Sequence, residues 1–232
     1  MVAQTPAFIT DYRGYKREQA KISRGRLYPV TVFYTAYSVL MLTLGLRSAH
    51  PRIAIFSYLM GFPVWSLVEY FFHRYVLHGR FKKSERPIKK YFAAFANKVL
   101  DPLHWEHHER PNDGMHINGV LKDLLPLFAV AAPLSFIFPL YTTPMLLAGT
   151  IQGYVSEEWI HHAIHFFNFK NKYFRYVKRH HLYHHSSRGI TRGFGITNGI
   201  WDVVFRSRFD DPPRKVWDFR SREKLLKSLE SK

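Results

Sequence analysis

Two apolar runs of bilayer length set the strongest limit on how this chain can fold. Residues 27–46, LYPVTVFYTAYSVLMLTLGL, carry no charged side chain, and residues 53–72 carry one, Glu69, near their end. About 20 apolar residues suffice for a helix to cross the hydrocarbon core of a bilayer. The short connection RSAHPR lies between the two runs. We therefore expect a first transmembrane hairpin at 27–72.

Two weaker apolar runs follow at 124–140 and 141–160. Prolines interrupt the first of them and carboxylates end the second, although neighbouring helices can cover the carbonyl groups that proline leaves free in a membrane. One interpretation is that both runs are buried helices of a soluble domain. The favoured interpretation is a second transmembrane hairpin at 120–160. The fold expected on that basis is all-α and integral to the membrane, with four transmembrane helices.

The polar segments of the chain lie at 1–26, 73–119 and 161–232, and all three are basic. An even number of spans puts them on one side of the membrane, and positive charge concentrates on the cytoplasmic side. We expect a basic N-terminal segment and a cytosolic helical cap formed by the other two. Apolar residues at helical spacing within 86–100 predict a helix that either lies in the membrane interface or packs on the cap. No secretory signal peptide is expected.

The absence of cysteine and the excess of basic residues limit the kinds of metal site and binding partner that this chain can have. The chain contains no cysteine, so any metal site must use nitrogen and oxygen ligands. Lys and Arg number 34 against 17 acidic residues, for a formal net charge of +17. Such a charge fits either a nucleic-acid binder or a protein that lies on anionic lipid. No nucleic-acid-binding motif accompanies the charge, and the apolar runs oppose that class, so no nucleic-acid partner is expected.

Histidines gather beyond the ends of the predicted spans. Thirteen of the 14 histidines fall between residues 73 and 185. The predicted metal ligands are His73, His78, His104, His107, His108, His161, His165, His181, His184 and His185. Each of the two H-x2-H-H triplets, and the i, i+4 pair at 161 and 165, places its histidines on one face of a helix. The H-x4-H pair at 73 and 78 lies part of a turn away from a common face, which suits the end of a helix. Ten protonated imidazoles would repel one another, but neutral imidazoles bind divalent cations. The pattern predicts two metals with about five ligands each.

Carboxylates are expected behind these ligands, because a ligating imidazole usually donates its other N–H group to an acceptor. Glu69 and Glu158 each lie about one helical turn before a predicted ligand, and Asp202 is a further candidate. His162 and His180 adjoin ligand positions, but helical geometry should turn them away from the metals.

Five ordered motifs carry a family resemblance: EYFFHRYVLH, LHWEHHERPND, GYVSEEWIHHAIH, KRHHLYHH and GFGITNGIWDVVF. Together they resemble the membrane fatty acid hydroxylase/sterol desaturase superfamily over about residues 60–210, and most of all its sphingolipid fatty acid 2-hydroxylases. The resemblance implies four transmembrane helices under a cytosolic helical cap, with two iron ions at the ten histidines. It also implies O2-dependent hydroxylation or desaturation of a lipid C–H bond. Zinc is expected to compete for such a site during purification.

Some positions depart from the family pattern. Phe166 stands where the 2-hydroxylases usually carry a further histidine, and Glu157 and Glu158 stand where a tyrosine-aspartate pair is familiar. The sequence contains no cytochrome b5 domain with its His-Pro-Gly-Gly motif. The resemblance therefore implies an external electron donor, either cytochrome b5-like or ferredoxin-like, with an NAD(P)H reductase.

These features predict a di-iron hydroxylase of the acyl chain of a fatty acid or sphingolipid, with 2-hydroxylation as the expected reaction. The acyl chain would reach the metals through a cavity between helices and cap, with Trp105, Trp159, Phe166 and Phe194 as candidate lining residues. The expected location is a bacterial inner membrane or the endoplasmic reticulum, with the histidines on the cytoplasmic side. One alternative is a sterol or carotenoid hydroxylase or desaturase of the same superfamily. Another is a non-enzymatic metal-binding or transport protein, although a transporter should place ionisable groups within its spans.

Overall fold

The computed structural model describes residues 12–79, 90–91, 93–94, 104–186 and 189–209. Within these ranges the chain is helical and has no β-strand, which confirms the predicted all-α class. The helix expected within 86–100 lies largely outside the described residues.

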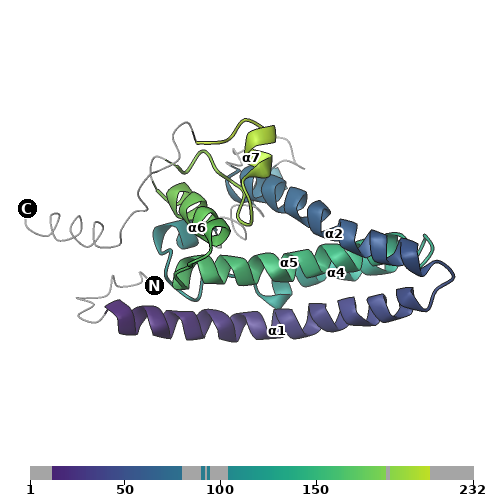
Figure 1. Ribbon diagram of the computed structural model, residues 1–232. Coiled ribbons are helices and arrows are strands. Elements are labelled where there is room, and N and C mark those ends of the chain that lie inside the picture. The colour runs from purple at the N-terminus through teal and green to yellow at the C-terminus, as the bar shows by residue number, and fades with distance from the viewer. Residues whose placement is uncertain (1–11, 80–89, 92, 95–103, 187–188, 210–232) are drawn as a thin grey trace, which may run out of the picture.

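Three long helices form an elongated bundle: α1 (Tyr12–Leu46), α2 (Pro51–Phe71) and α5 (Thr143–Phe166). Helix α5 packs against both of the others (Figure 1). The shorter helices α6 (Lys172–His184) and α7 (Ile200–Val204) lie at one end of this bundle, opposite the turn that joins α1 to α2 (Figure 1). The described part of the polar segment after α5 therefore lies at one end of the bundle.

Helix α1 begins at Tyr12, well before the apolar run that predicted it. Buried side chains continue at a spacing of three and four residues through the basic segment, at Ala20, Ser23, Leu27 and Val30. Side chains at that spacing share one helix face, so the basic residues between them remain on the other faces. The segment predicted as separate at 1–26 is therefore helical from Tyr12 and continuous with the first apolar run.

The second predicted hairpin has arms of unequal length. Helix α4 (Leu121–Ser135) has 15 residues, or about 22 Å, which is shorter than the roughly 30 Å of a hydrocarbon core. The apolar run at 124–140 predicted a longer helix. Pro139 accounts for the difference, because the residue before a proline is disfavoured in the α conformation. Turns follow instead, with Phe138 N donating to Ser135 O at 3.3 Å.

Among the described residues, two helical stretches are long and apolar enough to cross a membrane: α1, and Pro51–Leu77, which joins α2 to the π-helix η1 (Phe72–Leu77). Only 28% and 22% of their most apolar windows are buried inside the protein. Large apolar side chains are exposed instead, including Val32 at 68%, Phe56 at 65% and Leu127 of α4 at 65%. Extended apolar surface of this kind is typical of a face that contacts lipid or another apolar partner.

Glycines allow α2 and α5 to approach each other closely. A Cβ atom at Gly149 would lie 1.8 Å from Tyr58 O, and one at Gly153 would lie 2.7 Å from the Trp65 Cβ. Small residues four apart on one helix are a common device for close helix packing in membranes.

Gly149→Ala is expected to force α2 and α5 apart and to destabilise the protein by about 1–3 kcal/mol, the usual cost of overpacking. Gly25→Ala in α1 is the matched control, because a Cβ atom there would meet nothing within 4 Å. That control should be neutral or slightly stabilising, since alanine is the better helix former. Thermal unfolding in detergent measures both variants, and equal melting of Gly149→Ala and wild type would contradict the close packing.

Candidate metal centre

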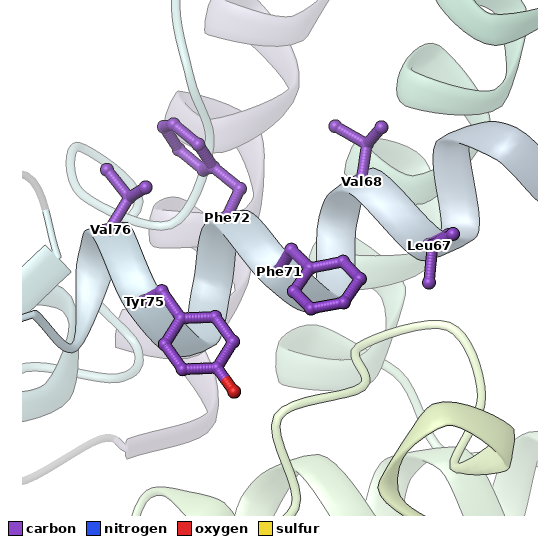
Figure 2. Close-up of a pocket in the computed structure, with 6 residues that line it drawn as sticks. All are labelled: Leu67, Val68, Phe71, Phe72, Tyr75 and Val76. Atoms are coloured by element: carbon purple, nitrogen blue, oxygen red, sulfur yellow. The ribbon is translucent and has the colours of Figure 1, made fainter. Parts of the chain in front are cut away.

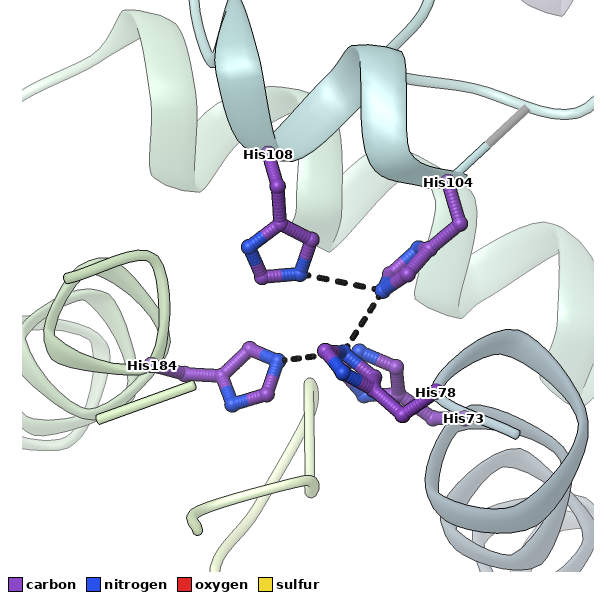
Figure 3. Close-up of side chains that lie close together, drawn as sticks. All are labelled: His73, His78, His104, His108 and His184. Atoms are coloured by element: carbon purple, nitrogen blue, oxygen red, sulfur yellow. Dashed lines mark hydrogen bonds between the residues drawn. The ribbon is translucent and has the colours of Figure 1, made fainter. Parts of the chain in front are cut away.

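The ten histidines predicted as ligands come together in two groups of five. The first group comprises His73, His78, His104, His108 and His184, and the second comprises His107, His161, His165, His181 and His185. Within each group one ring nitrogen per residue lies within 4.8 Å of the others. Figure 3 shows the five rings of the first group pointing toward one another from three different segments. The structure thus divides the ten histidines into two groups of five, and their role as metal ligands stays a prediction.

The π-helix η1 explains how the H-x4-H pair serves one group. His73 lies within η1, and His78 follows as its last cap residue, with its backbone N–H donating to His73 O at 3.0 Å. Five residues make about 1.4 turns of an α-helix but match the i→i+5 bonding of a π-helix. The wider turn brings both rings to the same side, which the α-helical periodicity applied to the sequence does not provide.

Helical residues 104–109 and helix α6 each supply both groups. In the first of these helices, His104 and His108 belong to one group and the intervening His107 belongs to the other. The groups are in direct contact, because the rings of His108 and His185 stack with centroids 4.2 Å apart. The structure therefore places two adjacent groups of five histidines on shared helices, each of which could hold a metal ion.

The spacing of the ring nitrogens fits coordination of a metal. In the first group, His78 Nε2 lies 2.7 Å from His104 Nε2 and 2.9 Å from His184 Nε2. In the second group, His181 Nε2 lies 2.9–3.0 Å from the Nε2 atoms of three other histidines. Imidazole nitrogens bind divalent metals at about 2.1 Å, so two of them at a right angle on one metal lie about 3.0 Å apart. The donor set of each group therefore fits one first-row divalent cation.

Backbone carbonyl groups orient two rings of the first group. His73 Nδ1 donates to Phe194 O at 2.5 Å, and His184 Nδ1 donates to Arg192 O at 2.7 Å. A neutral imidazole that donates from Nδ1 carries its lone pair on Nε2. The His73 Nε2 atom is buried and has no hydrogen-bond partner within the described part of the chain. Both rings therefore direct a metal-binding lone pair into the group.

Burial keeps the histidines neutral. Burial, together with repulsion from neighbouring histidines, lowers the pKa of His78 to about 3 and that of His108 to about 2. Burial lowers the pKa of His184 to about 4. The pKa values of His107, His181 and His185 are also well below the ordinary value, for the same two reasons. Neutral imidazole is the form that binds metal. The histidines of both groups are therefore in the protonation state that a metal ion requires.

These lowered pKa values predict that the metal-free protein loses stability in acid. Between the folded-state values of about 3–4 for His78 and His184 and the ordinary value of 6.5, the unfolded chain binds more protons than the folded one. Stability is therefore fully present above pH 6.5 and falls as the pH drops below it. Thermal unfolding of chelator-treated protein in detergent from pH 8 to pH 5 measures this effect. A midpoint that stays constant or rises toward pH 5 would contradict it.

The three predicted carboxylates are bonded to loops rather than to ligand rings. Glu69 accepts hydrogen bonds from Ile196 N at 2.6 Å and from Thr197 N at 3.1 Å. Glu158 accepts one from Asn118 Nδ2 at 2.8 Å. Among the described residues, neither carboxylate bonds to a histidine of the two groups. For His73 and His184 the acceptors are backbone carbonyl groups instead, from the segment that follows α6.

Asp202 of α7 holds that returning segment in place. It accepts hydrogen bonds from Phe194 N at 2.8 Å, Gly195 N at 2.9 Å and Ser207 Oγ at 2.6 Å. It also accepts one from His180 Nε2 at 3.0 Å. Burial raises its pKa, but these hydrogen bonds outweigh that effect and the pKa is lowered overall. Asp202 therefore supports His73 indirectly, because it holds Phe194, whose carbonyl group accepts the His73 hydrogen bond.

His162 and His180 stay outside both groups, as the helical geometry predicted. His162 Nδ1 bonds to Ser23 Oγ at 2.7 Å, and Ser23 also bonds to Asn118. This buried connection ties α1 to α5 next to the second group. The sequence carries no local signal for it, because Ser23 and His162 are 139 positions apart.

The four aromatic residues predicted to line a cavity divide into two pairs. The rings of Trp105 and Phe194 lie 5.5 Å and 5.3 Å from His78, against the first group. Trp159 and Phe166 pack instead on His162, at 5.8 Å and 5.0 Å, toward α1.

A groove of about 430 Å³ lies along the outer face of α2 and η1. Its lining residues, drawn in Figure 2, are Leu67, Val68, Phe71, Phe72, Tyr75 and Val76. None of the four predicted aromatic residues lines it. The groove is apolar, shallow and open to the outside of the protein, on the helical stretch that also carries His73.

Comparison with known proteins gives consistent matches. The sequence model of the family named fatty acid hydroxylase matches residues 58–207. The chain is 32% identical over 149 residues to dihydroceramide fatty acyl 2-hydroxylase FAH2 of Arabidopsis thaliana, a match that covers 62% of this chain and 57% of the plant protein. It is 27% identical over 193 residues to human fatty acid 2-hydroxylase, covering 82% of this chain and 47% of the human protein. The chain thus spans about half the length of these relatives.

A solved structure shares the fold. It is described as full-length Scs7p with only the hydroxylase domain visible, and it matches with a TM-score of 0.67 at 27% sequence identity. The match covers 83% of this chain and 69% of that one.

Proposed function

The chain belongs to the fatty acid hydroxylase family, and we propose that it is a membrane-bound, O2-dependent di-iron enzyme that hydroxylates the acyl chain of a lipid. The observation that carries the proposal is the pair of five-histidine groups, in which neighbouring Nε2 atoms lie 2.7–3.1 Å apart. All-nitrogen donor sets of this kind suit imidazole-binding metals such as iron, and zinc after purification.

The ten histidines would hold two iron ions, five to each ion. The iron ions would supply the reduction of O2 and the oxidising power that breaks an unactivated C–H bond. In the overall reaction, one oxygen atom enters the C–H bond and the other leaves as water, with two electrons and two protons consumed. The carbonyls of Phe194 and Arg192 keep the His73 and His184 rings aimed at the centre, and the rings of Trp105 and Phe194 cover the first group from water.

The substrate proposed is the acyl chain of a fatty acid or sphingolipid, with 2-hydroxylation as the reaction. Relatives from a plant and from human are named as acyl 2-hydroxylases, which supports that regiochemistry. The apolar groove on α2 and η1 supports a hydrocarbon chain rather than a polar substrate. The electrons would come from a one-electron carrier, cytochrome b5-like or ferredoxin-like, together with its NAD(P)H reductase.

The proposed topology has four membrane segments in two hairpins, at 27–72 and 120–160, with the segments 73–119 and 161–232 forming a cytoplasmic cap. The exposed apolar side chains of α1, α2 and α4 support it, as does the gathering of α6 and α7 at the end opposite the α1–α2 turn. Because α4 is short, its hairpin would cross only with local thinning of the bilayer or with help from the apolar turns that follow it. A bacterial inner membrane or the endoplasmic reticulum would suit this arrangement.

Lipid mass spectrometry on cells with and without the gene, grown under 18O2, tests the proposal. The expected result is an acyl chain heavier by one oxygen atom, with that atom derived from 18O2. A loss of two hydrogens would indicate desaturation instead. Unchanged lipids, with metal still bound in purified protein, would favour the transport or storage alternative.

A further inference from the structure

Helix α6 carries a stripe of positive charge on the face opposite its metal-site histidines. Its buried face carries Val177, which packs with Ile164 and Ile196, and His181 and His184, which belong to the two histidine groups. Lys172, Arg175 and Arg179 are exposed, and their spacing of three and four residues places them on one common face. We call these three residues the α6 stripe. At 100° per residue the stripe lies on the side of the helix opposite His181.

The α6 stripe is not neutralised within the described part of the chain. No carboxylate there forms an ion pair with any of its three residues. The nearest acidic side chain along α7, Asp202, is buried and committed to His180 and loop backbone. Positive charge that has no ion-pair partner among the described residues is a suitable surface for an acidic partner, because complementary potentials steer encounter and fix orientation.

A protein partner fits this surface better than a bilayer does. A helix that lies in a membrane interface turns an apolar face toward the acyl chains, but the apolar face of α6 is occupied by the metal centre. Its exposed large hydrophobic residues are Tyr173 and Tyr176, and the Tyr173 hydroxyl donates to Thr197 O at 2.8 Å. Exposed aliphatic side chains are found on α7 instead, where Ile200 is 64% exposed and Val203 is 57% exposed.

We propose that the α6 stripe is the docking surface for an acidic one-electron carrier protein, an inference that rests on the proposed function. A carrier bound there would be separated from the ligands His181 and His184 by the width of one helix, about 10–12 Å. Each docking event oxidises the carrier by one electron. Two such events supply the two electrons that the hydroxylation consumes, together with two protons from solvent.

The first test is binding of cytochrome b5, used as the probe carrier, to the purified full chain in nanodiscs. Arg175→Glu/Arg179→Glu is expected to weaken binding by at least about tenfold at low salt, because both changes reverse charges at the contact. Wild-type binding should weaken as salt rises and screens the contact, while the variant should be nearly insensitive to salt. The matched control is Arg47→Glu/Arg52→Glu, two exposed arginines at the opposite end of the bundle. Equal binding by all three proteins would overturn the proposal.

A second measurement separates docking from chemistry. Dithionite-reduced Arg175→Glu/Arg179→Glu, mixed with O2 and lipid, should form as much product as wild type, whereas its carrier-driven turnover should fall in parallel with binding. A loss with both reductants would overturn the docking role, because it would indicate damage to the centre. If wild type itself formed no product with dithionite, the proposed hydroxylase function would fail, and the binding result would still decide the docking surface.

A third measurement addresses the bilayer as the occupant. Because the chain has no cysteine, Lys172→Cys provides a unique attachment point for a spin label. In nanodiscs that contain phosphatidylserine, the label should remain accessible to a water-soluble relaxation agent and become protected when cytochrome b5 is added. Protection by lipid alone would overturn the proposal in favour of membrane contact.

Discussion

Replacing His184 with alanine is expected to lower acyl hydroxylation at least about 100-fold, because loss of groups that merely support metal ligands already costs 10–100-fold. The His184 ring faces His78 at 2.9 Å and is fixed from behind by the Arg192 carbonyl, so no other residue of the first group can take its place. Metal analysis should show loss of metal from the first group. Membrane insertion should be intact, since His184 belongs to the cap end.

The control for that prediction is His50→Ala. His50 is exposed in the turn between α1 and α2 and packs on Tyr141 with ring centroids 4.6 Å apart. It should leave activity and metal content close to wild type. Unchanged metal stoichiometry in His184→Ala would exclude His184 as a ligand. Loss of activity in His50→Ala would contradict the assignment of the active site to the histidine-bearing end of the bundle.

Replacing Asp202 with alanine is expected to destabilise the protein by about 3–5 kcal/mol, the range for removing one partner of a buried charged network. The change leaves the buried N–H groups of Phe194 and Gly195 and the His180 ring without their acceptor. Because the Phe194 carbonyl orients His73, release of this loop should also weaken metal binding at the first group. The second group should be less affected.

Thermal unfolding and metal titration of purified protein measure both effects. Asp123→Ala is the matched control, since Asp123 also accepts a backbone hydrogen bond, from Val120 N at 2.7 Å, but at the exposed start of α4. It should cost about 1 kcal/mol, as helix caps do, and leave the metals bound. An Asp202→Ala protein as stable as Asp123→Ala, with normal metal affinity, would show that the loop does not depend on this carboxylate.

The helical class and the candidate ligand set could be predicted from the sequence because both depend on the spacing of residues that are close together along the chain. Histidines three and four residues apart share a helix face whatever the rest of the chain does. The same reasoning placed His162 and His180 outside the centre, where the structure also has them. The same reasoning mispredicted the lengths of two helices. Helix α1 is longer than its apolar run, with a buried face that continues through Ala20 and Ser23, and α4 ends at Ser135, before Pro139.

By itself, the sequence determined which residues can face a common point: ten histidines, in numbers suited to two metals. Only the tertiary structure decided how each triplet divides between the two groups and why His73 and His78 face one way, through the π-helix. It also decided that loop carbonyls, rather than Glu69 or Glu158, receive the N–H groups of His73 and His184. Several of these features depend on contacts between segments far apart in the sequence, such as His73 with Phe194, which are 121 positions apart. Local spacing constrains a helix face, but only packing brings that face to its partner.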